Sequence, residues 1–340
     1  MNALKWGLVG YGEQAKRMAS ALKQLKNVEI TAVCCSSEDR AKAWEKEFGL
    51  ESYGKLSDFL DNAQTDVIYI ASPHHLHTPQ AFKAIEEGKN VLVEKPMALS
   101  VDGVHKLIDA AAKNKVTLGV NFPLRQHPGL QELKNEITSR GLGDIIQVYV
   151  HLSRKTYQGQ GWWRDQFHAG PMCLMDLGVQ GIDLLLWLAG ARALEVATVG
   201  RGGKDDQTLN IASLISMTLT DSGQGLVSSN NYALGDPNFV FLQGTEKAAL
   251  IELNWPEGDG SLKVRKLKAG SQEEKAYPPI DLLKACAQNF IAAVQGKAKF
   301  TPCCEETYPV VEATCAAIES LKSGKSVKAG EIQRISGARF

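Results

Sequence analysis

An apolar helix in the middle of the chain carries three polar side chains at regular intervals. The stretch CLMDLGVQGIDLLLWLAG, residues 173–190, is rich in leucine and is predicted to be buried, yet it contains Asp176, Gln180 and Asp183. In an α-helix, residues spaced i, i+4 and i+7 lie on one face, so these three would form a single hydrophilic stripe. Two carboxylates and an amide on one face can hold a polar ligand by hydrogen bonds.

A glycine motif near the N-terminus indicates a second site. Gly10, Gly12 and Ala15 form the pattern G-x-G-x-x-A between a short apolar run at 4–10 and a helical pattern at 13–25. A tight glycine turn between a strand and a helix N-terminus lets backbone N–H groups bind a pyrophosphate. The alternative is a glycine turn of packing value only. The predicted dinucleotide-binding turn comprises Gly10, Gly12, Glu13, Gln14 and Ala15.

The end of the next β-type run, residues 28–35, bears on which dinucleotide binds. An NAD site of this kind has a carboxylate there for the ribose hydroxyls, whereas this run ends in two cysteines followed by Ser36 and Ser37. Without that carboxylate, Ser36, Ser37 and Arg40 can hold a 2′-phosphate, which favours NADP over NAD. The acidic pair at 38–39 argues for NAD, and the alternative for the serines is that they cap the next helix.

A lysine follows another buried β-type run. The stretch VLVEKPMALS places Glu94, Lys95 and Pro96 where this run ends. Ligands of parallel α/β sheets bind at the carboxyl ends of the strands, and proline fixes the backbone at this point. Lys95 is therefore predicted to point into the ligand site; the alternative is a solvated surface lysine.

Alternating elements must position these groups. Over the first 120 residues, β-type runs such as 28–35 and 66–72 are separated by helical patterns, which predicts a doubly wound parallel sheet covered on both faces. After residue 143, β-type runs with turn residues dominate, and only the helix at 173–190 interrupts them. These runs predict an antiparallel or mixed sheet, followed by two closing helices from residue 281 onward. The predicted fold class is α/β.

Composition excludes several partner classes. The chain of 340 residues suits two domains, and Lys plus Arg equals Asp plus Glu at 38 each, so no net charge favours nucleic acid. No signal-peptide pattern is present, and no apolar run approaches the roughly 18 residues that span a bilayer. We expect a cytoplasmic protein with a small-molecule partner. The seven cysteines lack C-x-x-C spacing and are expected to be reduced and packed.

The chain resembles the Gfo/Idh/MocA oxidoreductases, named after glucose-fructose oxidoreductase and inositol dehydrogenase. The resemblance covers nearly the whole chain and is carried by GLVGYGEQAKR, DVIYIASPHHLHTPQAFKAIEEGKNVLVEKPMALS and WWRDQFHAGPMCLMDLGVQGIDLLLWLAG. It implies a Rossmann domain, here residues 1–122, followed by a substrate-binding and oligomerisation domain, residues 123–340. The latter would be an α/β domain with a large open, mostly antiparallel sheet, and helices within 281–325 would pack back on the first domain. A homodimer or homotetramer through that sheet is expected.

The resemblance also implies roles for single residues. Lys95 matches the family lysine that contacts the reacting hydroxyl or carbonyl oxygen, and Asp176 matches the aspartate of the family's D-x-G-x-H stretch. The histidine of that stretch is replaced by Gln180. The polar stripe is then expected to face the cleft between the domains, where nicotinamide and substrate would meet. Further cofactor-binding residues implied by the resemblance are Ser72, Pro73, His77, Glu94, Lys95 and Asn121.

The substitution by glutamine removes the usual proton carrier. Gln180 can orient a substrate but cannot titrate near neutral pH, so it cannot act as a general base. Lys95 can carry the proton itself, since desolvation beside a cationic nicotinamide favours its neutral form. Alternatively, Tyr157 or His168 reaches the site, or nothing replaces the histidine and ordinary polyols are not turned over.

Residues near the stripe are candidates for substrate binding. Trp163 offers a flat apolar face to a sugar, Arg164 offers a fork of donors, and Tyr157 lies in a loop expected to set specificity. Arg125 matches a family stretch that lines the cleft. Each has a structural alternative: Trp162 or Trp163 as core aromatics, Arg125 and His127 as part of a helix start at Pro128, and Asp183 as a purely structural residue. The histidines of SPHHLH lack an acidic partner, and no metal is expected.

Three functions compete on this reading. The leading hypothesis is an NAD(P)-dependent oxidoreductase that transfers hydride between the nicotinamide and a sugar, polyol or related carbonyl compound, with Lys95 polarising the oxygen. The second is a non-catalytic dinucleotide-binding regulator of the same fold, motivated by Gln180. The third is a glycosidase that uses a tightly held NAD for transient oxidation.

Overall fold

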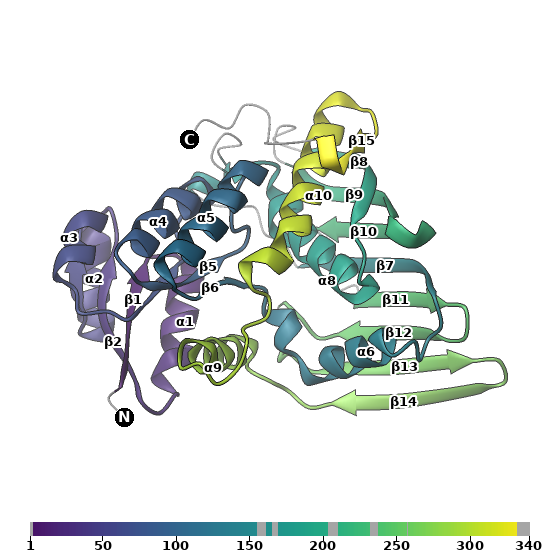
Figure 1. The fold of residues 1–340 in the computed structure, drawn as a ribbon, viewed down its shortest axis with the longest axis horizontal. Coiled ribbons are helices and arrows are strands. Elements are labelled where there is room, and N and C mark those ends of the chain that lie inside the picture. Colours follow the sequence, from purple (N-terminus) through teal and green to yellow (C-terminus); the bar gives the residue numbers. More distant parts are fainter. Residues whose placement is uncertain are drawn as a thin grey trace. The chain divides into compact units, whose positions relative to one another are not determined.

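The computed structural model describes residues 3–154, 161–164, 169–202, 210–231, 237–256 and 258–331. The chain divides into two compact units, each built around its own sheet (Figure 1). The first unit comprises Met1–Pro123 and Leu282–Thr307, and the second comprises Leu124–Asp281 and Tyr308–Phe340. The first unit thus combines the N-terminal segment with a segment from near the other end of the chain.

The sheet of the first unit has the order β3-β2-β1-β4-β5-β6, and all its neighbouring strands are parallel. This is the strand order of dinucleotide-binding doubly wound sheets and confirms the predicted fold class. Its strands are β1 Leu4–Val9, β2 Val28–Cys34, β3 Glu51–Tyr53, β4 Val67–Ile70, β5 Asn90–Glu94 and β6 Leu118–Asn121. The helices between them are α1 Glu13–Lys23, α2 Glu38–Phe48, α3 Leu56–Asn62, α4 His74–Glu86 and α5 Val101–Asn114.

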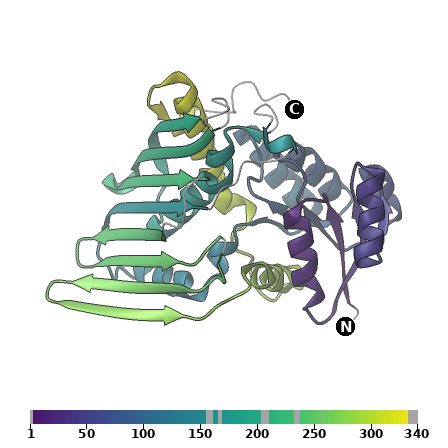
Figure 2. The same ribbon diagram turned by 180° about the vertical axis from the view of Figure 1, so that it is seen from behind.

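Helices cover both faces of this parallel sheet. On one face, α1 and α2 share a core cluster with α9 (Leu282–Val294), in which Met18, Trp44 and Phe290 are fully buried. The rings of Trp6 in β1 and Phe290 in α9 meet edge to face at 6.0 Å. Figures 1 and 2 show α4 and α5 side by side on the other face. Burial on both faces explains why β4 is a continuous apolar run.

The sheet of the second unit has the order β14-β13-β12-β11-β7-β10-β9-β8-β15. The pair β7 and β10 is parallel and the other pairs are antiparallel, which confirms the predicted mixed, mostly antiparallel sheet. Its strands are β7 Ile145–Ser153, β8 Ala193–Gly202, β9 Asn210–Leu219, β10 Gln224–Asn230, β11 Asn238–Gly244, β12 Ala248–Leu253, β13 Leu262–Lys268, β14 Ser271–Tyr277 and β15 Val327–Lys328. The remaining elements are η1 Pro123–Gln126, α6 Pro128–Thr138, η2 Gly161–Arg164, η3 Leu174–Gly178, α8 Val179–Ala189, η4 Thr220–Ser222, α10 Cys304–Ser323 and η5 Ala329–Glu331.

One face of the second sheet is covered by helices and the other is open among the described residues. Figure 2 shows the strands from the open face, with α6 and α8 behind them. Along β7, Val148 and Val150 are fully buried beneath the helices, whereas Tyr149 between them is more exposed. The open face still carries apolar side chains: Val199 is 71% exposed and Leu214 is 47% exposed.

The apolar stretch at 173–190 differs from the uninterrupted α-helix that its spacing predicts. Residues Leu174–Gly178 form a π-turn, in which the N–H of Val179 bonds to the carbonyl of Leu174, and α8 then continues to Ala189. Gly190 ends it in the left-handed conformation, with φ 67°. Because hydrogen bonds in a π-turn close over five residues, the α-helical spacing that aligned Asp176 with the later polar residues does not apply there.

All seven cysteines are buried and free of disulfide bonds. Burial raises the pKa of the Cys34 thiol to about 12, so this thiol stays protonated and packs as a small apolar group. Within the described residues, no helix is both long and apolar enough to cross a bilayer.

Candidate active site

The turn after β1 has the backbone that a pyrophosphate requires. Gly10 has φ +117°, and a Cβ there would lie 2.5 Å from the carbonyl oxygen of Ala71, directly after β4. Gly12 is the N-cap of α1, has no side-chain capping bond, and a Cβ there would meet no atom within 4 Å. Gly10 is therefore fixed by close packing, whereas Gly12 leaves the first N–H groups of α1 accessible, which fits a dinucleotide. The first turn of α1 contains the other predicted members, Glu13, Gln14 and Ala15.

Basic groups gather around an aromatic ring beside the end of β2. The guanidinium of Arg40 lies 5.8 Å from the centre of the Tyr11 ring, and the ammonium of Lys16 lies 4.8 Å from it. Ser36 is exposed, and Ser37 precedes α2 without accepting a capping hydrogen bond from it. Sequence reasoning missed Tyr11 and Lys16, although an aromatic residue inside the glycine motif followed by a lysine was a visible signal.

A buried histidine joins the segments that follow β4 and β5. The Nδ1 atom of His77 lies 2.8 Å from the carbonyl oxygen of Pro96, and Nε2 lies 2.8 Å from that of Ser72. Burial lowers the pKa of His77, and the two carbonyl oxygens oppose this effect. A neutral imidazole has one N–H to donate, so these contacts favour the charged ring. Ser72 Oγ also bonds to Gln80 at 2.5 Å, and Pro73 is the N-cap of α4.

Glu94 and Lys95 lie at the carboxyl end of β5 and are both buried. The hydroxyl of Tyr69 in β4 donates to Glu94 Oε1 at 2.5 Å, and the amide of Asn121 in β6 donates to the same oxygen at 2.6 Å. Burial raises the pKa of Glu94, while these hydrogen bonds and the charge of Lys95 act to lower it. Sequence reasoning selected Glu94, Lys95 and Asn121 but missed Tyr69, because a tyrosine in an apolar strand is typical of a core.

In the second unit, Asp176 lies in the π-turn and forms an ion pair with Arg154. Its Oδ2 is 3.1 Å from Nη1 of Arg154, which follows β7. Gln180 lies in the first turn of α8 and is 5% exposed. Its side-chain amide has no hydrogen-bond partner among the residues that the structure describes. A buried amide of this kind offers a donor and an acceptor but no titratable proton.

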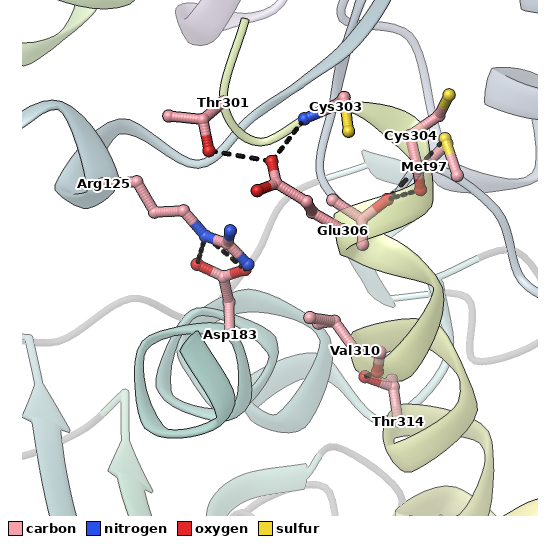
Figure 3. A network of polar contacts seen from close by, with 10 residues as sticks. Met97, Arg125, Asp183, Thr301, Cys303, Cys304, Glu306, Val310 and Thr314 are labelled. Carbon is pink, nitrogen blue, oxygen red and sulfur yellow. Dashed lines mark hydrogen bonds and ion pairs between the residues drawn. The ribbon is translucent and has the colours of Figure 1, made fainter. Parts of the chain in front are cut away.

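Asp183 is paired with a different arginine. Figure 3 shows the guanidinium of Arg125, in η1, facing the Asp183 carboxylate: Nη2 is 2.7 Å from Oδ1, and Nε is 3.1 Å from both oxygens. Neither side chain is more than 3% exposed, and the guanidinium also lies 5.5 Å from the centre of the Trp187 ring. This geometry supports the structural alternative for Asp183, and it holds Arg125 in a buried ion pair. The two carboxylates of the polar stripe are thus paired with different arginines, Asp176 with Arg154 and Asp183 with Arg125.

Other candidates lie near the stripe in sequence. Trp162 and Trp163 are half-buried and stack on each other, with ring centres 4.5 Å apart and planes at 25°. His127 accepts a hydrogen bond from Gly129 N at 3.0 Å and caps α6, as its structural alternative predicted. Three candidates lie outside what the structure describes: Tyr157, His168 and the side chain of Arg164.

A metal site was not expected around the histidines of SPHHLH. The rings of His74 and His77 are 5.6 Å apart and meet edge to face. In the part of the chain that the structure describes, no three His, Cys, Asp or Glu side chains are grouped as metal ligands. His77 is instead held by two backbone carbonyl oxygens.

The fold and these residues define a two-domain oxidoreductase with a dinucleotide-binding first domain. Residues 4–122 match the family model described as the oxidoreductase family with an NAD-binding Rossmann fold. Residues 130–249 match the model of the Gfo/Idh/MocA C-terminal domain. The chain belongs to the Gfo/Idh/MocA family, which confirms the resemblance found in its sequence.

Relatives in this family span much of the chain. An uncharacterized oxidoreductase of Rhizobium meliloti is 27% identical over 306 residues, covering 87% of this chain and 90% of the relative. Glucose-6-phosphate 3-dehydrogenase of Bacillus subtilis is 30% identical over 188 residues, covering 54% of this chain and 53% of the relative. The crystal structure of an aldose-aldose oxidoreductase from Caulobacter crescentus with glycerol has the same fold, with a TM-score of 0.83 at 19% identity and coverage of 96% of this chain and all of that one.

Proposed function

We propose that this protein transfers hydride between a nicotinamide dinucleotide and a sugar, polyol or related carbonyl compound. The relative from Bacillus subtilis acts on glucose 6-phosphate by its name, and the one from Caulobacter crescentus on aldoses. When bound, the dinucleotide supplies or accepts the hydride at C4 of its nicotinamide ring. The observation that carries the proposal is the combination of an open glycine turn at Gly12 with a buried lysine, Lys95, at the carboxyl edge of one parallel sheet.

Lys95 is the proposed catalytic residue. Its ammonium would stabilise negative charge on the substrate oxygen and give a proton to it during reduction, or take one during oxidation. Asp176 and Gln180 would bind substrate hydroxyls, because a carboxylate accepts and an amide both donates and accepts hydrogen bonds. Since Gln180 cannot titrate, the proton exchange is assigned to Lys95. The other predicted substrate residues, Arg125, Tyr157, Trp163 and Arg164, stay predictions.

Turnover of a Lys95→Met variant tests this role. Wild-type protein is screened with sugars, polyols and keto-sugars for a change in nicotinamide absorbance, in both directions. Loss of the cationic donor is expected to lower kcat by about 10²–10³-fold. Lys113→Met is the matched control, because Lys113 is exposed in the last turn of α5. A Lys95→Met variant with the kcat of the wild type would refute the catalytic role assigned to Lys95.

The proposed cofactor is NADP rather than NAD. Ser36 and Ser37 lie beyond β2 without a carboxylate between them and the strand, and Arg40 and Lys16 flank the Tyr11 ring beside them. Arg40 and the two hydroxyls suit a 2′-phosphate, whereas the ammonium of Lys16 is also paired with Glu47 at 3.0 Å. Arg40→Ala is expected to weaken NADPH binding about tenfold and to leave NADH binding within about twofold, measured by fluorescence titration. An equal loss for both dinucleotides would contradict the phosphate site.

A non-catalytic dinucleotide-binding regulator is the second candidate, and Gln180 is the observation that favours it. The buried Lys95 argues for catalysis, because a regulator has no need of a desolvated ammonium at the carboxyl end of β5. The substrate panel decides between them. A dinucleotide that binds and is oxidised or reduced by none of the compounds would favour the regulator.

Self-association through the open face of the second sheet is also proposed. Val199 in β8 and Leu214 in β9 are register partners on this face, and both are exposed. Such apolar sheet faces are normally covered, and a second copy of the chain gives a homodimer or homotetramer. Light scattering after size-exclusion chromatography should give a dimeric or tetrameric mass, and Val199→Lys should lower it. A monomeric wild type would refute this proposal. A cytoplasmic location stays a prediction.

A further inference from the structure

Three adjacent strands of the parallel sheet each contribute one buried polar side chain to the same point. Glu94 in β5 and Asn121 in β6 are direct register partners, and Tyr69 in β4 is the register partner of Leu92. Because side chains alternate along a strand, Leu92 and Glu94 share a face, and Tyr69 lies on that face with them. The sequence places a tyrosine where the rest of β4 is aliphatic, so its hydroxyl needs a partner.

That partner is a single carboxylate oxygen. Glu94 Oε1 accepts the Tyr69 hydroxyl at 2.5 Å and the Asn121 amide at 2.6 Å. Two donors directed at one oxygen stabilise the charged form of the carboxyl, whereas its burial stabilises the neutral form.

Other charged and titratable groups lie around Glu94. The positive charge of Lys95, the next residue in the chain, acts on Glu94 and also on the His77 ring. From α9, the thiol of Cys286 lies near enough for Glu94 to raise its pKa, after the larger effect of burial, so the thiol stays neutral. Burial and the charge of Glu94 hold the pKa of Tyr69 well above its usual range, so its hydroxyl stays a donor.

We propose that Tyr69 is a positioning residue that, together with Asn121, holds Glu94 as a fixed carboxylate beside Lys95. The inference rests on the proposed hydride transfer, in which Lys95 must polarise the substrate oxygen and exchange the proton because Gln180 cannot. A charged Glu94 attracts the ammonium of Lys95 and limits where it can lie. Without the Tyr69 hydroxyl, burial neutralises Glu94 and removes that attraction. Tyr69 therefore acts on the reaction through Glu94 and touches neither substrate nor cofactor.

The first test observes the Glu94 carboxyl directly and needs no turnover. Protein labelled with carbon-13 at glutamate side-chain carboxyls is titrated by NMR, and Glu94→Gln identifies the resonance by its loss. Tyr69→Phe keeps the ring volume and should move the Glu94 midpoint to higher pH. The matched control is Tyr53→Phe, because Tyr53 in the edge strand β3 also bonds to a glutamate, Glu51. An unchanged Glu94 midpoint in Tyr69→Phe would overturn the proposal.

A second variant keeps this test decisive if Tyr69→Phe does not fold. Asn121→Leu removes the other donor from the same oxygen and should move the Glu94 midpoint in the same direction. Circular dichroism and thermal melting establish that each variant is folded before it is titrated. If both folded variants leave the midpoint in place, burial alone sets the state of Glu94 and Tyr69 has no such role.

The second test uses a substrate found in the turnover panel. Tyr69→Phe should lower kcat about tenfold, leave the KM for the dinucleotide within about twofold, and move the acid limb of the kcat/KM profile to higher pH. In a Glu94→Gln background, Tyr69→Phe should have no further effect on kcat. An unmoved acid limb, or additive losses, would overturn the proposal while hydride transfer stands. A wild type that turns over no compound would instead refute the proposed function, and the NMR result would still decide the state of Glu94.

Discussion

Two regions of the molecule hold their polar side chains by different means. The first is the carboxyl end of strands β5 and β6 in the first unit, which we call the cofactor edge, and the second is the helix at residues 173–190 in the second unit. At the cofactor edge, Glu94 and Asn121 end neighbouring parallel strands and meet because the strand register brings them together. In the helix, Asp176 and Asp183 are each held by an arginine from elsewhere in the sequence. Strand register therefore positions the side chains of the first region, and ion pairs with arginine position those of the second. The regions should respond differently to single substitutions.

We expect the largest loss of stability when the Asp183–Arg125 ion pair is broken, and a much smaller loss when the Asp176–Arg154 ion pair is broken. Asp183→Asn leaves the charge of Arg125 buried and uncompensated, so the free energy of unfolding should fall by about 3–5 kcal/mol in urea denaturation. Asp176→Asn should cost about 1 kcal/mol or less, because the side chain of its partner Arg154 is 23% exposed. Equal losses from the two substitutions would show that the pairs do not differ in this way.

Substitutions of the two motif glycines should have different effects: Gly10→Ala should lower stability, and Gly12→Ala should weaken cofactor binding. Gly10→Ala forces a Cβ against Ala71 at a positive φ, and should lower the free energy of unfolding by about 2–3 kcal/mol. Gly12→Ala has open space around it, so stability should change by less than about 1 kcal/mol. Its Cβ would lie where the pyrophosphate is proposed to approach, so NADPH affinity should fall about tenfold or more. Unchanged affinity in Gly12→Ala would place the pyrophosphate elsewhere.

Restoring a titratable group in the helix tests whether Gln180 faces the chemistry. Gln180→His places an imidazole where α8 begins, and the pH profile of kcat should gain a limb near the usual titration range of histidine. The rate at neutral pH should change by no more than about tenfold, because the proton exchange is proposed to be carried out by Lys95. A pH profile identical to that of the wild type would show that residue 180 does not contact the reacting groups.

The smallest expected effect is a pH dependence of stability at Glu94. Its pKa is raised above 4.5 in the folded protein, so its contribution to stability is present below that value and is lost as pH rises. Glu94→Gln cannot ionise. The stability of the wild type relative to Glu94→Gln should therefore decrease as pH rises above 4.5, as measured by urea denaturation over a series of pH values. A relative stability that increases with pH would contradict the raised pKa.

The sequence predicted the type of sheet in each unit. Alternating apolar strands and helices predicted the parallel sheet, and turn-rich β-type runs predicted the mixed sheet, because burial on two faces and on one face leave different patterns. The left-handed Gly10 was also predictable, since G-x-G between a strand and a helix requires such a turn. These features depend on residues that are close in sequence.

What escaped prediction depends on residues that are distant in sequence. Tyr69 bonds to Glu94 only through the register of β4 and β5, and a tyrosine in an apolar run gave no signal for this contact. Arg154 follows a strand and gave no sign of a bond to Asp176. The π-turn left the hydrophobic pattern intact, so a stripe calculated for an α-helix aligned Asp176 with Gln180 and Asp183, although Asp176 lies within the π-turn.

A paired fluorescence titration of dinucleotide-free protein with NADPH and NADH tests directly whether the first unit binds a nicotinamide dinucleotide and which one it prefers. It needs no knowledge of the substrate, and it examines the glycine turn and the basic groups around Tyr11 together. We expect both dinucleotides to bind and NADPH to bind more tightly, because Ser36, Ser37 and Arg40 are proposed to contact its 2′-phosphate. Tighter binding of NADH would refute the phosphate site, and failure to bind either dinucleotide would contradict the proposed oxidoreductase.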